Sequence, residues 1–116
     1  MATIIDRDKA KSLIQEYRNQ NSATGGPALV TPDKKPHHGF FIDRQSLEDA
    51  LSNPKVTGIS LDLAKHPNYV GSPEHVFTLV YSGAQPAATG AATPYVSTGN
   101  IYCDPPPCPP NCTTLP

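Results

Sequence analysis

Three cysteines near the end of this 116-residue sequence are the residues whose type and spacing come closest to a known chemistry. Cys103, Cys108 and Cys112 each carry a thiol, and thiolates that converge on one point bind zinc or an iron–sulfur centre. Their spacing is not the C-x-x-C of such centres, and the prolines at 105–107 favour an extended backbone that separates Cys103 from Cys108. Residues 109–111 suit a turn between Cys108 and Cys112, because the asparagine there tolerates a left-handed conformation.

These thiols leave three interpretations open. The first is a metal site that uses Cys108 and Cys112 together with Cys103 or a histidine. The second is a Cys108–Cys112 disulfide in an oxidising setting, and the third is free or intermolecular thiols. An odd count of cysteines leaves at least one thiol unpaired within the chain. We interpret the adjacent His37 and His38 as solvated loop residues, because neighbours on a strand would point to opposite faces.

The motifs of common catalytic sites are absent from the sequence. It contains no H-E-x-x-H, no G-x-S-x-G, no glycine-rich phosphate loop and no paired acidic motif at a strand end. A cysteine nucleophile also needs a base within hydrogen-bonding reach, and a proline-rich segment holds a thiol poorly for that purpose. We therefore predict that the protein is not an enzyme and has no cofactor.

The net charge and the distribution of apolar residues limit the possible partners and the cellular location of the protein. A formal charge of -1 leaves no electrostatic footprint for nucleic acid or an anionic membrane. No apolar run approaches the roughly 20 residues that span a bilayer. The opening residues 1–11 carry charge on both sides of a short apolar patch, which is not the pattern of a secretory signal. We expect a cytoplasmic protein, with export without a leader left open.

The elements that must position these residues centre on Gly39 to Leu63. Asp43 has the side chain and position of a helix N-cap, and Ile42 and Leu47 have the spacing of a hydrophobic staple. Pro54 stops the predicted helix, because proline lacks an N–H group and disfavours helical geometry in the preceding residue. The stretch therefore predicts a strand, a capped helix and a second strand.

The rest of the chain completes an α+β fold. Residues 6–19 predict a first helix, and residues 20–38 a surface loop or, at 28–31, a short edge strand. Alternating apolar residues in Gly58 to Ala64 and His75 to Ser82 predict an antiparallel hairpin with a long loop, with Gly39 to Ile42 beside it. The fold predicted is two helices packed on a small antiparallel sheet. The first helix should bury an apolar stripe of Ala10, Leu13, Ile14 and Tyr17.

Proline content suggests where this domain ends. Eight of the fourteen prolines follow Ser82, which predicts a domain of residues 1–82 and an extended, proline-rich tail of residues 83–116. The domain has a marginal core for its size, and such domains often gain stability by self-association. The last predicted strand is apolar on both faces, which fits cover from a second subunit. The side chains expected to take part in association are Val76, Val80, Tyr95, Ile101 and Tyr102.

Four stretches together resemble a group of small uncharacterised bacterial proteins. They are AKSLIQEYR, GFFIDRQSLEDALSNPKVTGISLDL, HVFTLVYSG and the final CPPNC. The resemblance implies the same order of parts: a helix, a strand leading into a helix, a hairpin, and a Cys-Pro-Pro-x-Cys ending. It implies no activity.

The function expected from the sequence is that of a non-enzymatic structural or interaction protein. It would associate with itself, as a homo-oligomer or a polymer, through the sheet and the C-terminal tail. The alternative is a small metal-binding protein that uses the C-terminal cysteines.

Overall fold

The computed structural model describes residues 2–22 and 29–115 of the chain. Within them the chain forms two α-helices, one 3-10 turn and five strands, which confirms the α+β class. The elements in chain order are α1 (Arg7–Gln20), β1 (Gly39–Phe40), α2 (Arg44–Ala50), β2 (Gly58–Lys65), η1 (Pro67–Tyr69), β3 (Phe77–Pro86), β4 (Tyr95–Cys103) and β5 (Pro107–Cys108).

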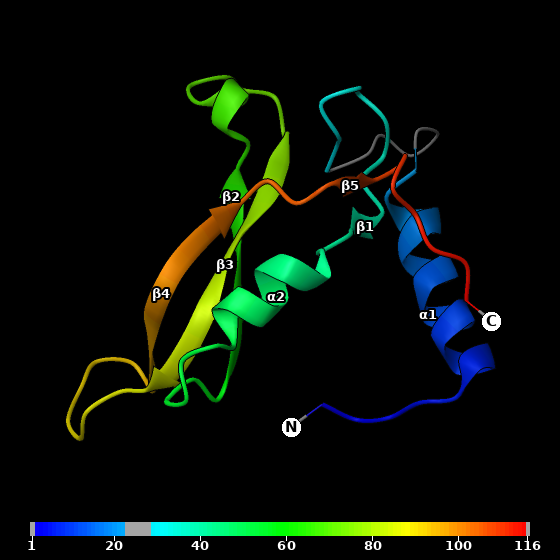
Figure 1. Ribbon diagram of the computed structural model, residues 1–116. Coiled ribbons are helices and arrows are strands. Elements are labelled where there is room, and N and C mark those ends of the chain that lie inside the picture. Colours follow the sequence, from blue (N-terminus) through cyan, green and yellow to red (C-terminus); the bar gives the residue numbers. More distant parts are fainter. Residues whose placement is uncertain (1, 23–28, 116) are drawn as a thin grey trace.

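The predicted hairpin is confirmed. β2 and β3 pair antiparallel from Gly58 opposite Ala84 to Lys65 opposite Phe77. β3 continues beyond the predicted end to Pro86 and forms the central strand of a sheet ordered β2-β3-β4 (Figure 1). Its buried residues, which include Leu79 and Tyr81, supply much of the core.

The predicted proline-rich extended tail is not confirmed, because much of residues 83–116 belongs to this sheet. β4 pairs antiparallel with β3 from Tyr95 opposite Pro86 to Cys103 opposite Val80. The prolines of this segment lie at the ends of the strands or beyond them, and the nine residues of β4 itself contain none. Because proline cannot donate to a strand ladder, a proline-free run rich in tyrosine, valine and isoleucine can pair where its surroundings cannot.

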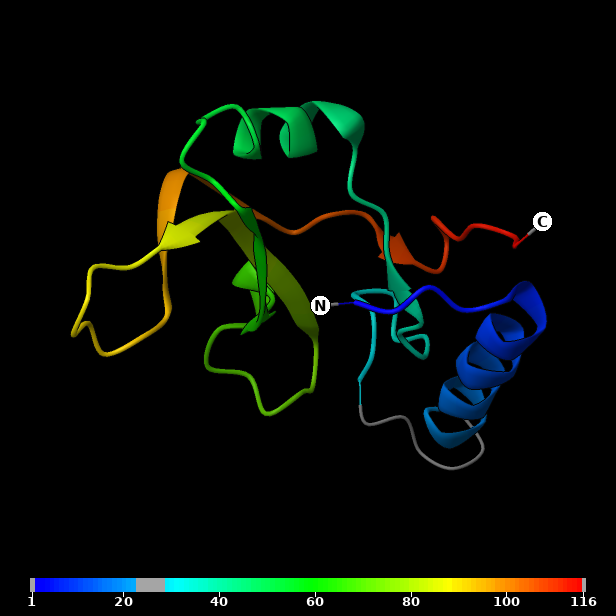
Figure 2. The same ribbon diagram turned by 90° about the horizontal axis from the view of Figure 1, so that it is seen from below.

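α2 packs across one face of the sheet (Figure 2). Asp43 caps it as predicted, accepting a hydrogen bond from the Ser46 backbone N–H at 3.1 Å. Ser46 and Ala50 are its buried residues, whereas Leu51 is 52% exposed. The close approach depends on Gly83 of β3, because a Cβ atom there would overlap the carbonyl group of Ala50.

α1 lies away from the three-stranded sheet, beside β1 and β5 (Figures 1 and 2). The predicted buried stripe is therefore wrong: Leu13, Ile14 and Tyr17 are 51%, 39% and 40% exposed. The helix has no broad sheet to pack against. It is anchored instead by polar contacts at its C-terminal end, where the Tyr17 hydroxyl donates to the His37 carbonyl at 3.0 Å.

β1 forms where the sequence predicts a strand, but its predicted partners are wrong. It pairs with β5, Gly39 opposite Cys108 and Phe40 opposite Pro107, in a separate two-stranded sheet. β4 already occupies the free side of β3, so β1 cannot join there.

The predicted loop of residues 20–38 is described only in part, because positions 23–28 lie outside the described residues. These include position 28, the first residue of the possible edge strand. Within the described part, Val30 forms single bridges to Pro36 and Val76.

Candidate functional site

β4 is an edge strand of unusual composition. It stands at the end of the order β2-β3-β4, so one side of its backbone has no strand neighbour among the described residues. Its sequence, YVSTGNIYC, contains no charged residue. Natural proteins usually protect an exposed edge with charged side chains, prolines or irregular pairing, because free N–H and C=O groups attract other strands. β4 has only the last of these, a register shift opposite Ser82 and Gly83.

The strand register determines which side chains share a face of the sheet. Directly opposed residues lie on one face, and alternate residues along a strand return to it. Val80 lies opposite Cys103, Ser82 opposite Ile101, and Pro86 opposite Tyr95. Val80, Tyr95, Ile101 and Cys103 therefore lie on the same side of the sheet, which we call the open face.

α2 covers the opposite face. The hydroxyl groups of Ser46 and Tyr81 share a hydrogen bond of 2.9 Å, which joins the helix to β3. The Tyr102 ring stacks on the Tyr81 ring with 5.4 Å between centroids. On the open face, Tyr95 and Ile101 of β4 are 60% and 66% exposed, while on the α2 side Leu63 of β2, opposite Leu79, is 75% exposed. The sheet thus has one face joined to a helix and one that presents apolar side chains to solvent.

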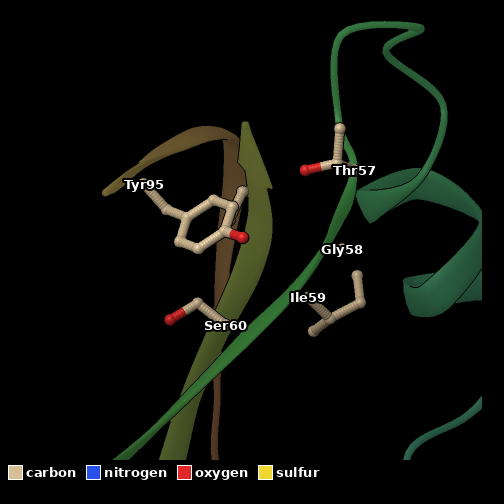
Figure 3. A pocket seen from close by; sticks show the side chains of 6 residues that line it. Thr57, Gly58, Ile59, Ser60 and Tyr95 are labelled. Carbon is tan, nitrogen blue, oxygen red and sulfur yellow. The ribbon is translucent and has the colours of Figure 1, made fainter. Parts of the chain in front are cut away.

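A shallow hollow of about 290 Å³ lies at one end of this sheet (Figure 3). In Figure 3 the Ile59 side chain points toward α2, whereas Ser60 and the Tyr95 ring lie on the other side of the strands. Pockets for small molecules usually measure about 300–1,000 Å³. This hollow is at the lower limit, so it suits one or two side chains of a partner better than a cofactor. The lining residues are Thr57, Gly58, Ile59, Ser60, Ala84 and Tyr95.

The structure brings together three of the five predicted interaction residues. Val80, Tyr95 and Ile101 share the open face. Tyr102 lies on the other face, where its hydroxyl donates a hydrogen bond to the Asp49 carboxylate of α2. Val76 is fully buried within its own chain, where it forms an isolated parallel bridge with Val30. Assigning Val76 to an interaction surface was therefore wrong.

Two carboxylates hold α2 in place beside a polar hollow of about 420 Å³. Hydrogen bonds from Ser46 lower the pKa of Asp43. Hydrogen bonds from Tyr102 and Asn100 lower the pKa of Asp49, and the same bond to Asp49 raises the pKa of Tyr102. Because folding lowers both carboxyl pKa values, these groups stabilise the fold above the unfolded pKa near 3.8. That contribution disappears as the pH falls through the folded pKa. The carboxylates act here as structural acceptors.

The cysteines separate into a pair and a single thiol. Cys108 and Cys112 form a disulfide with 4.7 Å between their Cα atoms, and Cys103 is a free, exposed cysteine. The predicted three-cysteine metal site is corrected accordingly, because two bonded sulfur atoms are no longer thiolate ligands. The described residues contain no group of three or more histidine, cysteine or acidic residues placed to hold a metal ion. The structure thus selects the disulfide among the three interpretations of the sequence.

The buried histidines have structural partners. His66 accepts a hydrogen bond at Nδ1 from the Asn68 backbone, and its Nε2 lies 3.4 Å from a carboxylate oxygen of Asp104. Asp104 also accepts from the Thr78 hydroxyl at 3.4 Å, so this group fixes the chain as it leaves β4. The predicted solvated His37 is buried, and burial lowers its pKa. Sequence reasoning missed the role of His66, since its partner Asp104 is far away along the chain.

The fold and this surface define a small α+β protein with one open sheet face and one uncharged edge strand. Comparison of the chain with protein-family models, curated proteins and solved structures found no match. Among the described residues, no helix has both the length and the apolar character that a membrane crossing requires.

Proposed function

We propose that this chain is a non-enzymatic interaction protein that associates with itself through the open face and the outer edge of β4. One observation carries the proposal: an edge strand without charge presents two largely exposed apolar side chains, Tyr95 and Ile101. The net charge of -1 supports a protein partner over nucleic acid, because it provides no basic footprint for phosphates.

A second copy is the partner that this surface fits best. When a strand pairs antiparallel with its own copy, each position faces a position of the same strand, and like charges opposite each other are destabilising. β4 has no charges, so its self-pairing carries no such penalty. The contact would also remove apolar area of Tyr95 and Ile101 from water, at about 25 cal/mol per Å². Such a two-fold contact uses the same patch on both copies and closes on itself.

The C-terminal residues contribute less than the sequence suggests. β5 is already paired with β1 of its own chain, and the Cys108–Cys112 disulfide closes the segment that follows. The part of the predicted tail that remains available for association is therefore β4. The disulfide also bears on location, because such bonds persist in oxidising compartments while the cytoplasm keeps thiols reduced. In the cytoplasm, Cys108 and Cys112 would therefore carry two reduced thiols in place of the disulfide.

Sedimentation equilibrium over a wide concentration range tests the proposal. The wild-type chain is expected to shift toward a dimer mass as concentration rises. Ile101→Lys and Tyr95→Lys should stay monomeric, because each places a charge in a contact that otherwise removes an apolar side chain from water. Val70→Lys is the matched control, since Val70 is 77% exposed in the loop after η1, away from β4.

Folding of each variant is checked by circular dichroism, so that lost association is not confused with lost structure. A wild-type chain that stays monomeric at every concentration contradicts the proposal. So does a wild-type dimer that neither lysine on β4 weakens, because its contact must then lie elsewhere.

A further inference from the structure

A second hollow, of about 290 Å³, lies on α1, away from the open face. One wall is a stripe of α1 at the spacing of a single helix face: Lys11, Ile14, Gln15 and Arg18. The other wall is the chain at residues 113–115, which follows directly after the Cys108–Cys112 disulfide. Two segments nearly a hundred residues apart in sequence thus enclose one site.

Among the described residues, the two cations of this site have no acidic partner. The ion pairs found among the described residues are Arg7–Asp8, Lys34–Glu74, Arg44–Glu48 and His66–Asp104. Neither Lys11 nor Arg18 takes part in them. Glu16, the acidic residue of this half of α1, does not line the hollow. Lys11 and Arg18 therefore line the same small space, and neither forms an ion pair with a carboxylate of the described residues.

Within the described part of the chain, Arg18 also lacks a hydrogen bond at one of its side-chain nitrogen atoms. Its Nε atom is buried and has no hydrogen-bond partner among the described residues. Most buried polar atoms in native proteins have a partner, so an exception needs an explanation, and a bound ion is one of those that apply. The charge of Arg18 also reaches His38, where it acts together with burial to lower the pKa of that imidazole. Arg18 thus adds positive potential to a partly enclosed region.

We propose that this hollow binds the phosphate group of a small ligand. Lys11 and the guanidinium of Arg18 supply two positive charges, which match the near-double negative charge of a phosphate at pH 7. The Gln15 amide and the hydroxyls of Thr113 and Thr114 supply uncharged donors around it. Ile14 and Leu115 form an apolar border, which suits the short organic part of a phosphate monoester. Inorganic phosphate carries the same phosphate oxygens and charge, so the hollow should bind it as well.

The experiment is a titration of the full chain with inorganic phosphate at low ionic strength, followed by amide chemical shifts. We expect saturable shifts in α1 and in residues 113–115. A small phosphate monoester should bind at least as tightly as inorganic phosphate, whereas acetate and chloride at matched ionic strength should bind much more weakly. Tighter binding of the monoester identifies a metabolite phosphate as the ligand, and equal binding identifies the phosphate ion.

Variants locate the site. Arg18→Gln should weaken phosphate binding about tenfold or more, because it removes one charge-assisted contact. Lys11→Gln, at an exposed position of α1, should weaken it without risk to the fold, and Arg18→Lys should retain only part of the affinity. Arg44→Gln is the control with the same loss of charge on an exposed side chain of α2, and it should bind as the wild type does.

The result that overturns the proposal is no saturable shift with phosphate, or an equal response to acetate and chloride. Unchanged affinity in both Lys11→Gln and Arg18→Gln overturns it as well. The proposal does not depend on self-association, because the open face and this hollow share no residue.

Discussion

Gly83 offers the sharpest test of how α2 meets the sheet. An added Cβ atom there would overlap the Ala50 carbonyl oxygen and lie 3.0 Å from the Cγ2 atom of Val56. The obstacle is backbone, so it cannot move aside like the end of a flexible side chain. Gly83→Ala must therefore displace α2 from β3 or distort the strand. Gly58→Ala is the matched control, because it makes the same change on β2, one position from Gly83 in the register, with open space around the added atom.

The two variants should differ greatly in their free energy of unfolding, although each adds only one methyl group. Overpacking a tight contact costs about 1–3 kcal/mol, and a backbone obstacle places Gly83→Ala at the upper end. Gly58→Ala should instead stabilise the protein by about 0.4–1 kcal/mol, because alanine restricts the unfolded chain. At about 4 °C per kcal/mol for a chain of this size, the melting temperatures should differ by more than about 8 °C.

The assay is thermal and urea unfolding of wild type, Gly83→Ala and Gly58→Ala, followed by circular dichroism under identical conditions. If Gly83→Ala melts with the wild type, α2 does not lie against β3 at this position. α2 would then not cover this face of the sheet, and the opposite face would not be distinguished as the free one.

Two further predictions concern the disulfide and the carboxylates. Cys112→Ser should lower the free energy of unfolding by about 2 kcal/mol, the loop-closure value for a ring of about five residues, while Cys103→Ser should leave the urea midpoint unchanged. A reducing agent should bring the wild type to the midpoint of Cys112→Ser, and a midpoint insensitive to it would show that the bond is absent. Asp49→Asn should remove part of the stability that the wild type loses between pH 7 and pH 3, since folding lowers the pKa of Asp49. Equal losses in Asp49→Asn and wild type, measured as urea midpoints at both pH values, would contradict that role.

The features that the sequence predicts correctly depend on local signals. Asp43 caps α2 because a carboxylate next to a helical run accepts the free N–H groups of its first turn. The β2–β3 hairpin follows from alternating apolar residues in both strands. In each case the sequence within a few residues determines the structure.

The features that the sequence misses depend on partners far along the chain. β4 is not predicted as one continuous strand, because the composition of residues 83–116 as a whole is dominated by prolines that lie outside it. α1 has an apolar stripe, and a stripe shows that a helix should be covered without showing what covers it. Cys108 and Cys112 admitted several pairings, and the choice among them required a turn geometry that spacing alone leaves open.

The two edges of the three-stranded sheet differ in a way that limits assembly under the proposed function. β2, the other edge, carries Asp62 near its centre and Lys65 at its end. Antiparallel pairing of two β2 strands about their centres would bring the two Asp62 carboxylates close together, which is destabilising. Pairing through β4 would form a six-stranded sheet whose outer edges are both β2. Growth then stops at the dimer, because the uncharged edge is used once in each copy and the charged edges remain outside.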